Sequence, residues 1–172
     1  MAARAIVGII LGILFAPVIF ILLTTISYSS EFANWFWSLF QGNFTDFAMD
    51  WVYAGGASMV APLMPSMTYL YSLIEGFGAG SLLTQFLPNY LPGLVTWTII
   101  GMWAGAIERS AGRGIGVGAG IWLGWLIIEL VFSAVTGLIG IFIDVLLAQL
   151  LTLLVVILVA AIFGAMTRSE EL

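Results

Sequence analysis

The sequence contains no cysteine and no histidine, and its four basic residues are all arginine. Disulfide bonds are therefore excluded, and zinc, haem and iron–sulfur sites would lack their usual ligands. Neither a Ser-His nor a Ser-Lys catalytic pair can be assembled. The chain also lacks the glycine-rich fingerprints of nucleotide-binding enzymes. These absences predict a protein that is not an enzyme and that holds no metal ion and no cofactor.

Charge is also scarce. Only 8% of the residues are charged and 62% are hydrophobic, whereas a typical soluble domain has about 25% charged residues. The mean hydropathy is +1.17. A soluble core of this size could not bury so much apolar surface, so we expect the lipid bilayer to be the solvent. The formal net charge of −5 argues against binding to nucleic acid or to anionic lipid headgroups.

Four apolar segments are candidates for membrane-spanning helices. They cover residues 5–27, 92–107, 115–136 and 141–166. The first would reach about 34 Å as a helix, enough for a hydrocarbon core of about 30 Å, and Pro17 should kink it. The alternative for this segment is a cleaved signal peptide. The apolar part of a signal peptide runs about 7–15 residues, which is shorter than this segment.

The arginines indicate how these segments are oriented. They lie before the first segment, between the second and third, and after the fourth: Arg4, Arg109, Arg113 and Arg168. Basic residues collect on cytoplasmic flanks. Four crossings with both termini in the cytoplasm place every arginine there, whereas a fifth crossing within residues 51–75 would misplace three of them. We therefore expect an all-α integral protein of the cell membrane, with residues 1–172 forming a single membrane domain.

The segment 31–41 between the first and second crossings is amphipathic. Its large apolar side chains share one helical face: Phe32, Trp35, Phe36, Leu39 and Phe40. The segment is too short to cross a bilayer, and aromatic side chains favour the membrane–water interface. We interpret it as an outer interfacial helix. The alternative is that its aromatic face docks on a partner protein.

Residues 51–90 are apolar but carry residues that disturb helices. These are Gly55, Gly56, Pro62 and Pro65. Irregular backbone at membrane depth is tolerated only where it is buried in protein or lines a cavity. Two interpretations stay open, namely a re-entrant or broken helical segment on the outer side and a compact outer cap packed on the bundle. Just upstream, Asn43 begins an Asn-Phe-Thr triplet, a glycosylation acceptor on the outer side.

Small residues recur at helical spacing in the apolar segments. One row has four glycines in register: Gly112, Gly116, Gly120 and Gly124. The other segments carry Gly8 with Gly12, Gly101 with Gly105, and Ala160 with Gly164. Glycines at this spacing let two helix backbones approach closely. They predict helix packing, either within a monomer or at an interface with a second copy or with other membrane subunits.

Two acidic residues lie inside predicted crossings, Glu129 and Asp144. Ionisable groups in a membrane are costly and are functional candidates by default. Together with Gln149 they predict an ion or proton site between the third and fourth crossings. The alternative is that both carboxyl groups sit at the membrane–water interface and have no role.

Two functional classes follow from these patterns. The sequence favours a non-catalytic structural or accessory subunit of a larger membrane assembly, because small-residue faces and aromatic surface accompany the absence of catalytic groups. The alternative is a small oligomeric channel or transporter for an ion or small solute that uses Glu129 and Asp144, because interrupted membrane segments often form transport sites.

Overall fold

The computed structural model describes residues 2–27, 41–42, 44–60, 87–137 and 139–169. These residues form α-helices and contain no β-strand, which confirms the all-helical prediction for the described part of the chain. The helices are α1 (Ala2–Ser27), α3 (Phe44–Val60), α6 (Leu87–Glu108), α7 (Ala111–Thr136) and α8 (Ile139–Ser169).

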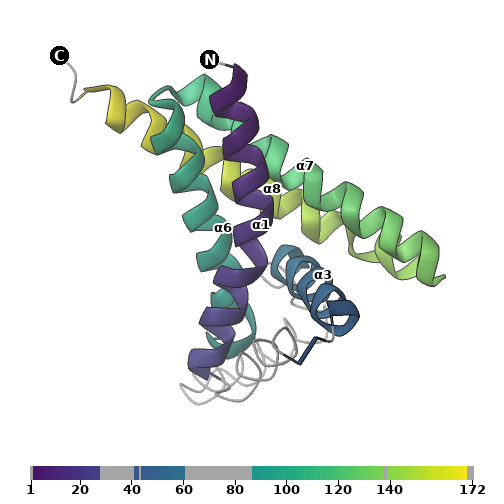
Figure 1. Cartoon of the computed structure of the whole chain (residues 1–172). Helices are drawn as coiled ribbons and strands as arrows, with labels where there is room; N and C mark the ends of the chain where they lie inside the picture. The colour runs from purple at the N-terminus through teal and green to yellow at the C-terminus, as the bar shows by residue number, and fades with distance from the viewer. Residues whose placement is uncertain (1, 28–40, 43, 61–86, 138, 170–172) are drawn as a thin grey trace, which may run out of the picture.

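The helices form two crossing pairs with α3 in the angle between them (Figure 1). Helices α7 and α8 run antiparallel and side by side, and α1 and α6 lie along one another and cross that pair. Helix α3 contacts all four of the others. The start of α1, the end of α8 and the α6–α7 turn lie at the same end of the bundle (Figure 1). The α7–α8 turn lies at the opposite end of that helix pair.

Two short turns set the order of α6, α7 and α8. Arg109 adopts a φ of 46°, a left-handed conformation that is uncommon outside glycine, and the chain reverses within two residues. Gly137 has a φ of 75° and donates its backbone N–H to the Ser133 carbonyl, which ends α7. Because both turns are tight, α7 reverses sharply from α6 and runs antiparallel to α8 (Figure 1).

The outward faces of the helices are apolar. Two described segments are long and apolar enough to cross a membrane, Ala3–Leu23 and Ala111–Thr136, and only 28% of each is buried in the bundle. A stripe at four-residue spacing follows the outer face of α8: Leu150, Leu154, Leu158, Ile162 and Met166. Soluble monomers rarely expose such continuous apolar surface. These helices are therefore compatible with a membrane protein.

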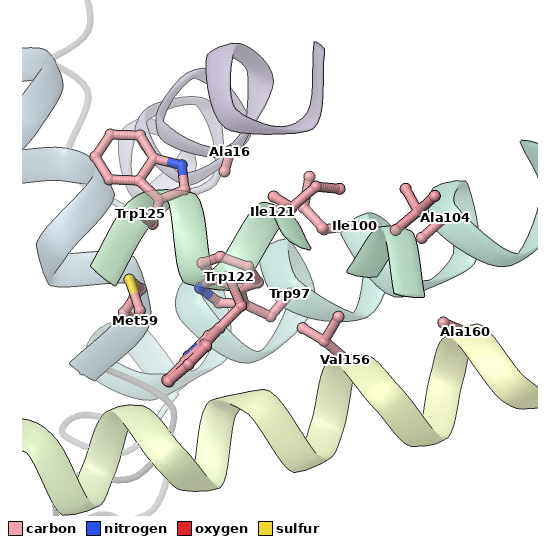
Figure 2. Close-up of a cluster of buried hydrophobic side chains, with 11 residues drawn as sticks. Ala16, Met59, Trp97, Ile100, Ala104, Ile121, Trp122, Trp125, Val156 and Ala160 are labelled. Atoms are coloured by element: carbon pink, nitrogen blue, oxygen red, sulfur yellow. The ribbon is translucent and has the colours of Figure 1, made fainter. Parts of the chain in front are cut away.

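The core is a cluster to which all five described helices contribute (Figure 2). Its members are Ala16, Met59, Trp97, Ile100, Ala104, Val117, Ile121, Trp122, Trp125, Val156 and Ala160. Trp97, Trp125 and Met59 have no exposed surface. A buried aromatic side chain removes about 150–250 Å² from solvent, so these tryptophans account for much of the packing. Helix α3 is built into this core and does not simply cover it.

Two helices differ from the segments that the sequence predicts. Helix α6 begins at Leu87 and not at residue 92 as predicted, so Pro92 lies inside it. Gly55 and Gly56 lie within α3 and do not interrupt it, because the packing of α3 uses the space that their missing side chains leave. Residues 31–40, Asn43 and residues 61–86 lie outside the described residues. The interfacial helix, the glycosylation site and the rest of the broken segment therefore stay predictions.

Candidate functional site

Helix α3 ends inside the bundle. Ser58 and Met59 in its last turn are fully buried, and Val60 is its last residue. The Thr152 hydroxyl of α8 donates a hydrogen bond of 2.5 Å to the Met59 carbonyl in the last turn of α3. With 17 residues, α3 is about 25 Å long and shorter than a hydrocarbon core of about 30 Å. It is a short helix whose C-terminal end is fixed to α8.

An ionisable side chain meets an amide beside this helix end. Gln149 of α8 is only 1% exposed, and its Nε2 donates a hydrogen bond to Oε2 of Glu129 on α7. The other polar atom of the amide, Gln149 Oε1, is buried and has no hydrogen-bond partner among the described residues. A buried acceptor without a donor is unfavourable by about 1–3 kcal/mol. This oxygen therefore marks a polar site that is incomplete as it stands.

Two glycines bring the backbone of α3 against this site. A Cβ atom built on Gly56 would collide with Oε1 of Glu129, and one built on Gly55 would collide with the ring of Trp125. The absence of a side chain at Gly56 lets the carboxyl group lie directly on the α3 backbone, and its absence at Gly55 makes room for the indole. Glu129 is thus enclosed by α3 on one side and by Gln149 of α8 on another.

Two buried indoles hold the helices in place around the site. Trp122 Nε1 donates a hydrogen bond of 2.9 Å to the backbone carbonyl of Gln149, which fixes α8 against α7 at the level of the site. Trp97 Nε1 of α6 donates to Ser58 Oγ at 3.2 Å, and the Ser58 hydroxyl donates to the Gly55 carbonyl at 2.6 Å. These bonds satisfy the polar groups of the indoles inside an apolar core.

A further indole ties α7 to the first helix. Pro17 lies inside α1 and has no N–H, so the Ile13 carbonyl lacks its helical partner. Trp125 Nε1 donates to that carbonyl at 3.1 Å. The rings of Trp51 and Trp125 are 4.7 Å apart between centroids, and Trp51 Nε1 donates to the Leu14 carbonyl at 3.4 Å. Helices α1, α3 and α7 are therefore joined one turn away from Glu129.

The depth of the polar pair follows from its position along the helices. Glu129 and Gln149 each lie about 8 Å from the middle of their helix, and both are displaced toward the α7–α8 turn. Half of a hydrocarbon core is about 15 Å. If α7 and α8 cross the bilayer, the pair lies among lipid chains in depth and not among headgroups.

An apolar groove between α1 and α3 is a weaker candidate site. Its volume is about 490 Å³, and it is lined by Leu14, Phe15, Val18, Phe44, Phe47, Ala48 and Trp51. Small-molecule sites normally include a few polar groups that fix the orientation of the ligand. This lining is almost wholly apolar, so it offers nothing that would select a polar ligand.

The chemistry of the polar pair suits a small cation better than a structural metal centre. One carboxylate and one amide oxygen are assembled, whereas Ca²⁺ takes about six to eight oxygen ligands and Mg²⁺ demands an octahedral set. Among the residues that the structure describes, no group of three or more His, Cys, Asp or Glu side chains could hold a metal ion. A single carboxyl group in an apolar interior instead calls for one compensating positive charge.

Of the residues that the sequence nominates for an ion site, the structure brings Glu129 and Gln149 into contact. Asp144 lies in α8, but its side chain is outside the description. Sequence reasoning missed Gly56, which borders the carboxyl group, and Thr152, which pairs with α3. A signal for Thr152 existed, because it follows Gln149 by three residues and so shares its helical face.

The residues nominated for helix packing fall into two groups. Most lie against neighbouring helices: Gly8, Gly12, Gly101, Gly105, Gly120, Gly124, Ala160 and Gly164. At Gly105 an added Cβ would be 2.6 Å from the carbonyl oxygen of Ala160 and 2.7 Å from the nitrogen of Gly164. Gly112 and Gly116 have no described atom within 4 Å of such a Cβ. The glycine row of α7 is therefore divided, and its first two members face away from the bundle.

Comparison with protein-family models, curated proteins and solved structures finds no match to this chain.

Proposed function

We propose that this chain crosses the membrane four times, through α1, α6, α7 and α8, with both termini in the cytoplasm. The segments that carry the arginines are the start of α1, the α6–α7 turn and the end of α8, and they gather at one end of the bundle (Figure 1), which supports this orientation. The outer interfacial helix at residues 31–41 is part of the same proposal.

Thiol labelling tests this topology, because the chain has no native cysteine. In sealed, right-side-out vesicles, a Ser110→Cys variant should resist a membrane-impermeant thiol reagent until the membrane is permeabilised. Labelling from the outside would overturn the orientation.

We further propose that the protein is non-catalytic and carries a small cation, a proton or a metal cation, through the site of Glu129 and Gln149. The observation that supports this proposal is the contact between these two side chains beside the buried end of α3. Ionisable groups inside a membrane protein mark ion and proton pathways, and helices that end at membrane depth often form transport sites. This geometry favours transport over the accessory role that composition alone favours.

Flux into sealed proteoliposomes tests the proposal. Purified wild-type protein should pass protons or radioactive sodium faster than protein-free vesicles do. Glu129→Gln preserves the shape of the side chain and removes its charge, and it should reduce flux to the protein-free level. Glu108→Gln is the matched control, because it makes the same chemical change at the end of α6. This position is next to the start of α7, which lies about 27 Å of helix from Glu129. Equal flux in the wild type and Glu129→Gln, or tight vesicles with folded wild-type protein, would refute the proposal.

The accessory-subunit role is the second candidate, and the open half of the glycine row favours it. Gly112 and Gly116 lie on one face of α7 with no described neighbour, and small residues at this spacing promote helix association in membranes. The mass and composition of the complex gently extracted from its native membrane should then include other chains, and Gly116→Leu should release them. A solitary monomer would exclude this role.

A further inference from the structure

We propose that the ligand of this site is a proton, and that the Gln149 amide is the positioning group that completes the protonated carboxyl of Glu129. The inference deepens the proposed function, since it rests on the same pair of residues, but it does not require that the proton crosses the membrane.

The Gln149 amide and the Glu129 carboxyl group have matching shapes. An amide and a carboxyl group each hold two polar atoms on one planar carbon, at about 1.2–1.3 Å from it. With Gln149 Nε2 bonded to Oε2 of Glu129, the remaining atoms of the pair are Gln149 Oε1 and Glu129 Oε1. Both are acceptors when Glu129 is a carboxylate. The pair therefore has one hydrogen bond, and its other two polar atoms are both acceptors.

A single proton completes this arrangement. Water or hydronium at the site delivers the proton, and an O–H bond forms on Oε1 of Glu129 while its charge changes from −1 to 0. The new hydroxyl donates to Gln149 Oε1, the buried oxygen that has no partner among the described residues. Release of the proton reverses each change, and no electron is transferred. Protonated carboxyl and amide are then joined by two parallel hydrogen bonds.

The α3 backbone argues for a proton over a metal cation. A Cβ on Gly56 would already collide with Oε1 of Glu129, so the carboxyl group has little free space on that side. A metal cation needs room for several oxygen ligands, whereas a proton occupies the bond itself. Gly56 therefore brings the carboxyl group close enough to α3 to exclude a bulky ligand.

Other titratable groups on the packed helices are potential contributors and must be controlled. The described polar side chains around the pair, Ser58 and Thr152, do not titrate. Several acids and tyrosines on neighbouring helices have side chains outside the description: Asp46, Asp50 and Tyr53 on α3, Tyr90 on α6 and Asp144 on α8. Charged groups elsewhere on these helices are Arg4, Glu108, Arg113 and Arg168, which lie toward the ends of the helices away from the pair.

Infrared difference spectroscopy between acid and alkaline conditions provides a readout that does not depend on flux. The C=O stretch of a protonated carboxyl group is absent from a carboxylate, so uptake by Glu129 should give a band in the full-length wild-type protein. Glu129→Gln should remove one component of that band, whereas Asp144→Asn and Glu108→Gln should retain it. Gln149→Leu should keep the component but move it to higher frequency, because the carboxyl group loses its amide partner.

The outcomes separate this inference from the transport proposal. A band component that survives Glu129→Gln, or one that Gln149→Leu does not move, overturns the inference. So does saturable binding of radioactive sodium that Glu129→Gln abolishes, because the ligand is then a metal cation. A Glu129 band without flux supports proton uptake by Glu129 and refutes transport. Glu129-dependent flux without the band supports transport and refutes proton uptake by Glu129. If Glu129→Gln does not fold, the frequency shift of the carboxyl band in Gln149→Leu tests whether Glu129 takes up the proton beside this amide.

Discussion

The two halves of α7 are packed by different means. In the N-terminal half, Gly114 and Gly118 let the helix backbone approach α6 and α8, and a Cβ on Gly114 would lie 2.9 Å from the Gly105 Cα. In the C-terminal half, Trp122 bonds to α8 and Trp125 bonds to α1 through their side chains. One end of the helix is held by backbone contact and the other by side-chain contact.

This difference separates a rigid region from an adaptable one. Backbone atoms in contact cannot move without shifting whole helices, because packed interiors resist local change. Side chains can change rotamer or hydrogen-bond partner within a fixed backbone. A site that takes up and releases a ligand is therefore expected in the C-terminal half of α7, which is held by side-chain contacts and contains Glu129.

The largest expected loss of stability comes from a substitution where helix backbones are in contact near the N-terminal half of α7. Gly105→Ala would place its Cβ 2.6 Å from the Ala160 carbonyl oxygen, and overpacking of this kind typically costs about 1–3 kcal/mol. We expect the free energy of unfolding to fall by about 2 kcal/mol, measured by denaturant unfolding in detergent micelles. A variant as stable as the wild type would show that these helices can separate freely.

A smaller effect is expected where a side chain joins the helices. Trp125→Phe removes the hydrogen bond to the Ile13 carbonyl, and the unfolding free energy should fall by about 1–2 kcal/mol. In a Pro17→Ala background, the restored N–H at residue 17 can pair with that carbonyl. Trp125→Phe should then lower the free energy of unfolding by less than it does in the wild type. Equal costs in the two backgrounds would contradict the assigned role of the indole.

A change at Gly56 should affect function more than stability. The three atoms nearest to a Cβ at this position all belong to the Glu129 side chain, which is flexible. Alanine also gains about 1 kcal/mol over glycine in helix propensity, so we expect the net change in unfolding free energy to stay below about 1 kcal/mol. The carboxyl group must move, and the Glu129 infrared band should shift. An unchanged band would mean that α3 does not position this residue.

The smallest change in unfolding free energy, and one that increases stability, is expected at Gly112 and Gly116, which have no described neighbour. Gly116→Ala meets no described atom and should leave the isolated protein equally stable or up to about 1 kcal/mol more stable. Analytical ultracentrifugation of the same variant reports whether this face binds another chain. Marked loss of stability in the isolated protein would show that a neighbour outside the described residues packs here.

The sequence predicts the helical class and the contents of the site to different degrees. Long apolar runs indicate α1, α7 and α8 directly, because lipid and helix geometry both demand continuous apolar residues. The start of α6 was misplaced because Pro92 suggests a beginning, whereas the structure has helix before it. The two glycines of α3 likewise suggest a break, because local helix propensity does not include the close packing that they allow.

The pairing at the site shows what sequence patterns leave out. Glu129 could be selected because an acid in an apolar helix is unusual. Its partner depends on the register between α7 and α8, which the α7–α8 turn and the Trp122 bond set together. Ser58 and Gly56 come from α3, whose position relative to α7 and α8 no periodicity encodes. Their roles became visible only when the helices were placed in three dimensions.

The bond between Trp125 and Ile13 also has a consequence for synthesis. The two residues are 112 positions apart in the chain. Ribosomes add about 5–20 residues per second, so α1 emerges about 6–22 s before the indole that pairs its free carbonyl has been made. If α1 lies in the bilayer, lipid offers no donor during that interval. Nascent chains that stop before α7 therefore carry an unfinished first helix, and they are the forms that membrane quality-control proteases should recognise.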